Sequence, residues 1–233
     1  MIKAVFFDLY QTLVSFEPPR EEIQAKALQE YGIEASPDAF RRPLSIADEF
    51  IYQEIARLPF SRRSKEEQAV LWAKYERIVL KEAGVPVSDD LIRFLLQKMH
   101  QTKMKTVPFA DVIPALTDLK KRGIILGLIS NVERDISPLL KETGLEPLLD
   151  VVVTSQDAGV NKPNPEIFHK VLRRAGVKAS EAIYVGDQYQ IDILGAQKAG
   201  MKGILLDRNG YYADITDCPR IQSLSELPHY LTE

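Results

Sequence analysis

The stretch GIILGLISNVERDISPLLKETGLEPLLDVVVTS, residues 123–155, decides the fold. It begins and ends on a short apolar run, and the segment ERDISPLLKETG between them has a helical pattern that stops at a glycine. Buried parallel strands read as continuous apolar runs, and glycine commonly follows the last residue of a helix. The stretch therefore predicts a strand–helix–strand unit with two parallel strands.

The same two textures alternate elsewhere in the chain. Further strands are expected in IKAVFFD (2–8), EAIYVGD (181–187) and KGILLD (202–207). Further helices are expected in ADVIPALTDLKKRG, NPEIFHKVLRRAG and QIDILGAQKAG, which also end in glycine. This alternation predicts an α/β fold, in which helices cover both faces of a doubly wound parallel sheet.

Residues 16–100 have a different texture, with long helical patterns and no expected strand. The patterns are EEIQAKALQEYG, PLSIADEFIYQEIARL, SKEEQAVLWAKYERIVLKEAG and SDDLIRFLLQKMH, and prolines at positions 18, 19, 37, 43, 59 and 86 separate the segments. We therefore expect a core made of residues 1–15 and 101–233, with an all-helical insertion at 16–100. An insertion after the first strand would lie over the carboxyl edge of the sheet, where such sheets bind ligands.

Composition limits the classes of partner. The 233 residues are 45% hydrophobic and 27% charged, with a net charge of −3, which gives no general attraction to nucleic acid or to an anionic membrane. No apolar window is long enough to span a bilayer. The single cysteine, Cys218, excludes an internal disulfide and suits a reducing compartment. We expect a cytoplasmic protein that acts on a small molecule, without nucleic-acid or membrane partners.

Polar residues follow the apolar strands at the point where each strand ends. They are Asp8, Ser130, Asn131, Lys162, Asp187 and Asp192. Because the carboxyl ends of neighbouring parallel strands meet at one edge, these side chains are expected to surround one small volume. Crowded carboxylates repel each other unless a cation neutralises them, and Mg²⁺ prefers such oxygen ligands. A strand-end aspartate beside Mg²⁺ and a lysine is a candidate nucleophile, and Lys162 and Ser130 would hold the transferred oxygens.

Each of these residues also has a purely structural interpretation. Asp8 and Asp187 suit turns after strands, and Asp192 would order its loop. Ser130 and Asn131 are favoured residues before a helix and would cap one that starts near Arg134.

The segments FFDLYQT, LISNVE, VNKPNPEIF and YVGDQYQID resemble, in order, the four motifs of the haloacid dehalogenase superfamily. This resemblance implies a Rossmann-like core with a helical cap domain inserted after the first motif. It implies Asp8 as a covalent nucleophile within a catalytic set: Asp8, Tyr10, Thr12, Ser130, Asn131 and Lys162. The implied Mg²⁺ site comprises Asp8, the backbone carbonyl of Tyr10, Asp187 and, as a further or indirect ligand, Asp192. The implied substrate-binding residues are Ser130, Asn131 and Lys162.

Tyr10 departs from the phosphatase pattern, in which an aspartate at this position is the general acid and base. A phenol with a pKa of about 10 is poorly matched to that task near neutral pH. The Asp8–Leu9–Tyr10 sequence resembles the 2-haloacid dehalogenases of the same superfamily, whose halide leaving group needs no proton. Asp187 argues against that reaction, because attack on carbon needs no metal and an unneutralised carboxylate would repel a haloacid.

Three functions therefore remain open. The first is Mg²⁺-dependent hydrolysis of a small phosphorylated metabolite with a good leaving group. The second is metal-independent 2-haloacid dehalogenation, for which Arg41 or Arg42 would bind the substrate. The third is a non-catalytic ligand-binding relative. Hinges for movement of the cap are expected near residues 14–18 and 100–108.

Overall fold

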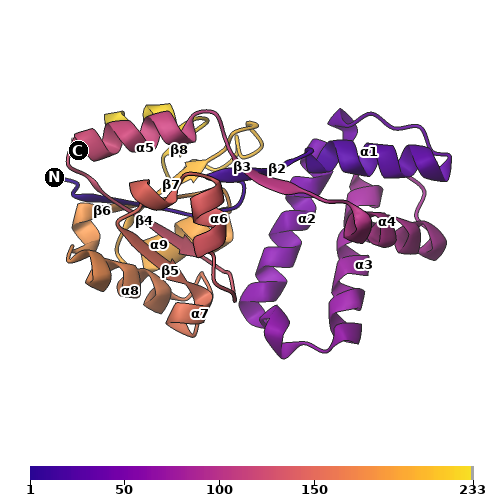
Figure 1. Ribbon diagram of the computed structural model, residues 1–233, viewed down its shortest axis with the longest axis horizontal. Helices are drawn as coiled ribbons and strands as arrows, with labels where there is room; N and C mark the ends of the chain where they lie inside the picture. Colours follow the sequence, from indigo (N-terminus) through magenta and orange to yellow (C-terminus); the bar gives the residue numbers. More distant parts are fainter. Residues whose placement is uncertain (232–233) are drawn as a thin grey trace. The chain divides into compact units, whose positions relative to one another are not determined.

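The computed structural model describes residues 1–231, and the chain divides into two compact units (Figure 1). One unit combines residues 1–15 and 106–233, and the other spans residues 16–105. We call them the core unit and the helical unit.

The core unit is built on a six-stranded parallel sheet with the strand order β5-β4-β1-β6-β7-β8. The strands are β1 Ala4–Phe7, β4 Ile125–Ser130, β5 Val151–Thr154, β6 Ala182–Gly186, β7 Lys202–Leu206 and β8 Arg220–Ile221. Five of the six were expected from their apolar runs, and these predictions are confirmed. β8 is not predicted by the sequence, because two residues carry no detectable periodicity. β1 pairs with β4 on one side and β6 on the other, so Asp8 directly follows an inner strand of the sheet.

Helices cover both faces of this sheet, as predicted; α5 lies on one side and α8 on the other (Figure 1). The helices are α5 Val112–Lys121, α6 Ser137–Glu142, α7 Ser155–Ala158, α8 Pro165–Ala175 and α9 Leu194–Lys198, with a π-helical turn at Tyr189–Ile193. The glycines expected after four of the helical segments, at 123, 144, 176 and 200, all have φ between 68° and 81°. Such left-handed backbone is easily adopted only by glycine, which is why the helices stop there.

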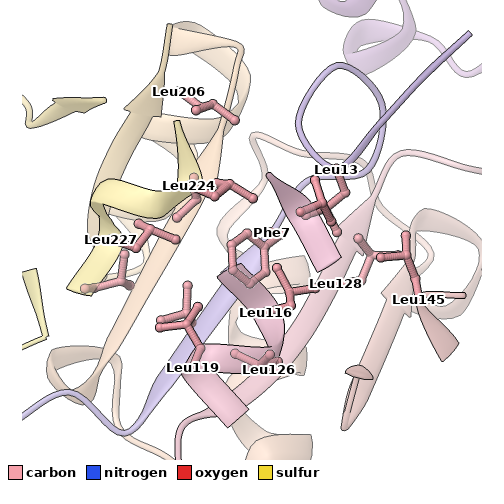
Figure 2. Close-up of a cluster of buried hydrophobic side chains, with 14 of the residues drawn as sticks. Phe7, Leu13, Leu116, Leu119, Leu126, Leu128, Leu145, Leu206, Leu224 and Leu227 are labelled. Atoms are coloured by element: carbon pink, nitrogen blue, oxygen red, sulfur yellow. The ribbon is translucent and has the colours of Figure 1, made fainter. Parts of the chain in front are cut away.

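Alternation along β1 divides the core in two. Val5 and Phe7 face a cluster that includes Leu116 and Leu119 of α5 (Figure 2). Ala4 and Phe6 face the opposite cluster, which includes residues of α8 and α9. Because successive strand residues point to opposite faces, one four-residue strand contributes to both layers. All four side chains are fully buried, so Asp8 follows a rigid segment.

The helical unit packs four helices around its own apolar cluster. They are α1 Arg20–Tyr31, α2 Asp38–Arg57, α3 Lys65–Glu82 and α4 Asp89–Gln101. Ser64 and Glu67 form a capping box at the start of α3, and the Ser88 hydroxyl accepts from Leu91 N at the start of α4. Pro43 does not separate two segments as expected. It lies buried inside α2, and the helix continues through it although proline lacks the N–H for one helical hydrogen bond.

Two further strands, β2 Val14–Glu17 and β3 Lys105–Pro108, pair with each other where the chain passes between the units. The expectation that no strand occurs after residue 16 is therefore wrong for the end of β2. A four-residue strand is too short for its pattern to show in the sequence. The part of the chain that the structure describes contains no helix long and apolar enough to cross a membrane.

A buried polar network crosses the interior of the helical unit. The Arg20 guanidinium forms two hydrogen bonds with Asp48, at 2.8 and 2.6 Å, and the Tyr75 hydroxyl donates to Asp48 at 2.9 Å. Beside it, the buried Gln24 amide donates to the Glu76 carboxyl at 3.0 Å. Burial raises the pKa of Glu76 to about 7, because the hydrogen bond from Gln24 does not offset the desolvation of its charge.

This raised pKa predicts that the helical unit loses stability as the pH rises. Folding favours the protonated form of Glu76, so its contribution is fully present below about pH 4.5 and is lost as the pH passes about 7. A shift of this size corresponds to an effect on the order of 3 kcal/mol. Glu76→Gln is expected to flatten the pH dependence of urea unfolding between pH 5 and 8. The fluorescence of Trp72, the only tryptophan, reports unfolding of this unit.

The matched control is Glu82→Gln, which removes an exposed carboxylate from the same helix. It is expected to follow the wild-type pH dependence. An equal slope in wild type and Glu76→Gln would contradict the assignment of a protonated Glu76.

Candidate active site

Lys162 lies at the centre of a buried cluster at the carboxyl edge of the sheet. Its ammonium group donates to Asp8 Oδ1 at 2.6 Å, Asp192 Oδ1 at 2.7 Å and the Tyr184 hydroxyl at 2.9 Å. These three bonds use all three ammonium protons. Only 3% of the Lys162 side chain is exposed, against 13% for Asp8 and 1% for Asp192. Residues separated by more than 150 positions in the sequence thus form one ion-pair network.

The charges in this cluster stabilise each other unequally. Burial raises the pKa of Asp8 to about 6, and Lys162 limits the rise while Asp192 adds to it. Burial lowers the pKa of Lys162, but Asp192 and Asp8 raise it by more, so the lysine remains protonated at neutral pH. Burial, followed by the charge of Asp192, raises the pKa of Tyr184, which keeps its phenol as a donor. Lys162 therefore favours the ionised form of Asp8, which burial opposes.

Asp192 holds Lys162 in place. Its Oδ1 accepts from Lys162 and from the Tyr184 hydroxyl, and its Oδ2 accepts from Gln188 N at 3.0 Å. The π-helical turn that contains Asp192 brings it beneath β6, where a Cβ atom on Gly186 would lie 2.3 Å from Asp192 Oδ2. Glycine is therefore required at position 186, because any side chain would displace the carboxylate.

Asp187 follows β6 and lies beside the loop after β1. The Thr12 hydroxyl donates to Asp187 Oδ1 at 3.2 Å, and the Gln188 amide donates to Oδ2 at 2.9 Å. Carboxylate oxygens of Asp8, Asp187 and Asp192 lie within 4.8 Å of one another. Three such oxygens suit a hard divalent cation such as Mg²⁺. Asp8 and Asp187 fit best as direct ligands, because Asp192 is the most deeply buried of the three, with 1% of its side chain exposed against 13% for Asp8, whereas Asp187 is partly exposed.

The loop that carries Asp8 folds back on itself. Leu13 N and Val14 N both donate to the Leu9 carbonyl, and Gln11 N donates to Val14 O. Gln11 adopts φ 62°, a left-handed conformation that costs a residue with a side chain about 1 kcal/mol. Leu9 and Leu13 are fully buried and anchor the loop. Tyr10 lies between them, and its hydroxyl accepts from Arg134 at 3.4 Å.

Ser130 and Asn131 do not cap a helix, because the next helix begins at Ser137. Ser130 is the last residue of β4 and is buried. The Asn131 side chain accepts from Lys162 N at 2.7 Å and donates to Lys162 O at 3.0 Å. Asn131 therefore fixes the backbone of the lysine.

The predicted start of α8 is confirmed. The Asn164 side chain accepts from Glu166 N, and Pro165 is the first helical residue. This places the Lys162 loop directly before a helix N-terminus, where backbone N–H groups favour an anion.

The structure thus brings together five of the candidate side chains, joined by hydrogen bonds in two groups whose carboxylates lie within 4.8 Å of one another. They are Asp8, Thr12, Lys162, Asp187 and Asp192. The candidate arginines lie in α2 of the helical unit. Arg41 pairs with Glu21 and Asp38 on the surface, and Arg42 is exposed.

Two participants were missed in the sequence analysis. Tyr184 bridges Lys162 and Asp192, and Gln188 donates to both Asp187 and Asp192. The signal for Tyr184 was a hydroxyl within an otherwise apolar strand, since a buried phenol needs a partner. Gln188 gave no signal beyond its position next to Asp187.

Comparison with known proteins places this geometry in a family. A family described as "Haloacid dehalogenase-like hydrolase" matches residues 5–206. A curated relative, glyceraldehyde 3-phosphate phosphatase from Methanopyrus kandleri, is 32% identical over 92% of this chain and 88% of its own.

Of two similar solved structures, one is described as a phosphatase and the other as a dehalogenase. One is described as a HAD phosphatase from Thermococcus onnurineus (28% identity, TM-score 0.57, 99% of this chain and 98% of that one). The other is described as a 2-haloacid dehalogenase from Pseudomonas syringae pv. Tomato (31% identity, TM-score 0.57, 100% and 99%). This chain belongs to the haloacid dehalogenase-like hydrolases.

Proposed function

We propose that the protein is a Mg²⁺-dependent phosphatase that uses Asp8 as its nucleophile and acts on a small phosphorylated metabolite. The observation that carries this proposal is the position of Asp187, because a carboxylate oxygen of Asp187 lies within 4.8 Å of a carboxylate oxygen of Asp8. Attack on carbon needs no such second acid, whereas a metal that neutralises a phosphoryl group does. The M. kandleri relative, which is named as a phosphatase of a three-carbon sugar phosphate, supports the same reaction class.

In this proposal the metal is held by Asp8, Asp187 and the backbone carbonyl of Tyr10. When bound, it supplies charge neutralisation between the attacking carboxylate and the anionic substrate. Asp192 serves indirectly, because its oxygens hold Lys162 and the backbone of Gln188. Thr12 and Gln188 orient Asp187 by donating one hydrogen bond to each of its oxygens.

The chemistry then runs through Asp8. One oxygen of its carboxylate attacks the phosphorus, the bond from phosphorus to the leaving-group oxygen breaks, and an aspartyl phosphate forms. Water then attacks the phosphorus, releases inorganic phosphate and restores the carboxylate. Lys162 holds the transferred oxygens by turning towards them the proton that it otherwise donates to Asp8. Ser130 holds them as well, and Asn131 keeps Lys162 in position.

Tyr10 sets the kind of leaving group. A phenol is a weak proton donor near neutral pH, so hydrolysis of phosphate esters whose alkoxide leaving group needs a proton would be slow. The carboxylate of an acyl phosphate, or the alkoxide of an acidic alcohol, leaves without that proton. We therefore expect the rate to depend strongly on the leaving group's own pKa.

The helical unit would act as a cap that selects the substrate, with movement at the paired strands β2 and β3. Arg41 and Arg42 remain candidates for substrate contact within this cap.

Dehalogenation is the second candidate, favoured by Tyr10 two residues after Asp8 and by the P. syringae structure described as a 2-haloacid dehalogenase. In that reaction Asp8 would displace a halide from carbon to give an ester, which water then hydrolyses. Neither step needs a metal.

A paired assay separates the two reactions. The purified protein is given acetyl phosphate and para-nitrophenyl phosphate in one arm and 2-chloropropionate in the other, each with Mg²⁺ or with EDTA. We expect phosphate release that EDTA abolishes and that Asp187→Asn loses. Halide release that is indifferent to EDTA would instead establish dehalogenation, and turnover in neither arm would favour a ligand-binding role.

A further inference from the structure

Arg208 reaches from β7 to the loop that carries Asp8. It lies two residues after the last residue of β7, and β6 separates β7 from β1 in the sheet. Its Nη2 donates to the Thr12 carbonyl at 2.9 Å. Only 16% of the Arg208 side chain is exposed. A buried cation thus contacts the backbone of the nucleophile loop from two strands away.

The guanidinium of Arg208 is itself held firmly. Its Nη1 donates to Asp111 Oδ2 at 2.9 Å, and its plane lies over the Phe109 ring at 4.1 Å. Asp111 Oδ2 also accepts from Ser223 Oγ and Leu224 N. Burial raises the pKa of Asp111, but the bonds from Arg208, Leu224 and Ser223 and the charge of Arg208 together lower it by more, so the pair is ionic at neutral pH. The arginine is therefore a fixed support for the carbonyl.

The contact with Thr12 leads directly to the candidate metal site. The Thr12 side chain is fully buried, and its hydroxyl donates to Asp187 Oδ1 at 3.2 Å. Thr12 thus accepts from Arg208 through its carbonyl and donates to Asp187 through its hydroxyl. Backbone bonds hold the two ends of this loop, from Asp8 N to Val185 O of β6 and from Phe109 N to Leu13 O, and the bonds among Leu9, Gln11 and Val14 fix its shape. The Arg208 side chain adds a bond to the carbonyl of Thr12, the residue that contacts Asp187.

We propose that Arg208 is a positioning residue of the active site, which acts through Thr12 to orient Asp187 and thereby sets the affinity for the divalent metal. The proposal rests on the proposed Mg²⁺ phosphatase for the identity of the metal, but its test does not depend on turnover. Groups that orient metal ligands typically affect affinity by about 10–100-fold when removed.

The test measures Mg²⁺ binding by calorimetry, together with thermal unfolding, for Arg208→Gln, Arg208→Lys and Arg220→Gln. Arg220 is the matched control, because it pairs with Asp207 at 3.4 Å. We expect Arg208→Gln to weaken Mg²⁺ binding about 10-fold or more. Arg220→Gln should bind as wild type does. Arg208→Lys keeps the charge beside Asp111 but lacks the second nitrogen that donates to Thr12. Compared with Arg208→Gln, it should regain more of the wild-type thermal stability than of the wild-type Mg²⁺ affinity.

A double-mutant cycle with Thr12→Val tests the route. If Arg208 acts through the Thr12 hydroxyl, the losses in Mg²⁺ affinity in the two single variants should not add in the double variant. Affinity that simply follows thermal stability across all variants would overturn the proposal, as would additive losses. Should wild-type protein bind Mg²⁺ yet release no phosphate, the proposed function fails while this cycle still decides the role of Arg208.

Discussion

Asp8→Asn is expected to abolish turnover without lowering the stability of the fold. The amide cannot attack phosphorus or carbon, so the rate should fall by about 10⁴-fold or more with either substrate class. The same substitution is expected to preserve or increase the free energy of unfolding. Since burial raises the pKa of Asp8 to about 6, ionised Asp8 opposes folding at neutral pH, by up to roughly 3 kcal/mol. The uncharged asparagine removes this cost.

The measurement compares melting temperatures with and without Mg²⁺. In EDTA the variant should melt at or above the wild-type temperature. Added Mg²⁺ should raise the wild-type melting temperature by binding only the folded state, and should raise that of the variant much less. The control is Asp118→Asn, which removes an exposed carboxylate paired with Arg122 and should change neither activity nor the Mg²⁺ response. Full activity in Asp8→Asn would refute the nucleophile assignment.

Lys162→Met is expected to cost both activity and stability. The substitution leaves Asp8 and Asp192 buried without the cation that contacts both of them. Breaking a buried ion pair in this way typically costs about 3–5 kcal/mol. The pKa of Asp8 should rise further, because Lys162 is the group that limits its rise, so less of the nucleophile would be ionised at neutral pH. We expect turnover to fall by about 10²-fold or more.

The double variant Lys162→Met with Asp192→Asn separates these effects. It removes one buried charge of each sign, so urea unfolding at pH 7.5 should show recovery of much of the lost stability. Activity should not recover, because the lysine is still absent. The instability of the single variant should also shrink as the pH falls and Asp8 takes up a proton. A single variant as stable as the double variant would mean that the unpaired carboxylates carry no cost.

Sequence patterns were sufficient for the features that depend on local chemistry. Apolar runs located β1, β4, β5, β6 and β7, and glycines located the helix ends, because burial and left-handed backbone are properties of short segments. The rule that polar residues at the ends of parallel strands meet at one edge predicts that Asp8, Lys162 and Asp187 lie together. These three side chains lie close together because parallel strands share a direction.

The remaining features depend on contacts between distant segments. Nothing adjacent to Arg208 in the sequence indicates that it reaches Thr12 across an intervening strand. Asn131 looked like a helix cap or a substrate ligand, and only the fold shows its amide bound to the backbone of Lys162. The network of Arg20, Asp48 and Tyr75 was invisible for the same reason, since its members come from three helices.

The pairing of β2 with β3 has a consequence for how such proteins diversify. The chain leaves the core unit through β2 and returns to it through β3, and these two strands are neighbours. The core unit therefore has two neighbouring points of attachment, at Ser15 and Thr106. A segment of almost any length can be spliced between such points, because the cost of closing a longer loop grows only slowly. Recombination can therefore replace residues 16–105 as a block and leave the register around Asp8 untouched. If the helical unit selects the substrate as proposed, substrate range and reaction chemistry are inherited on separate stretches of one gene.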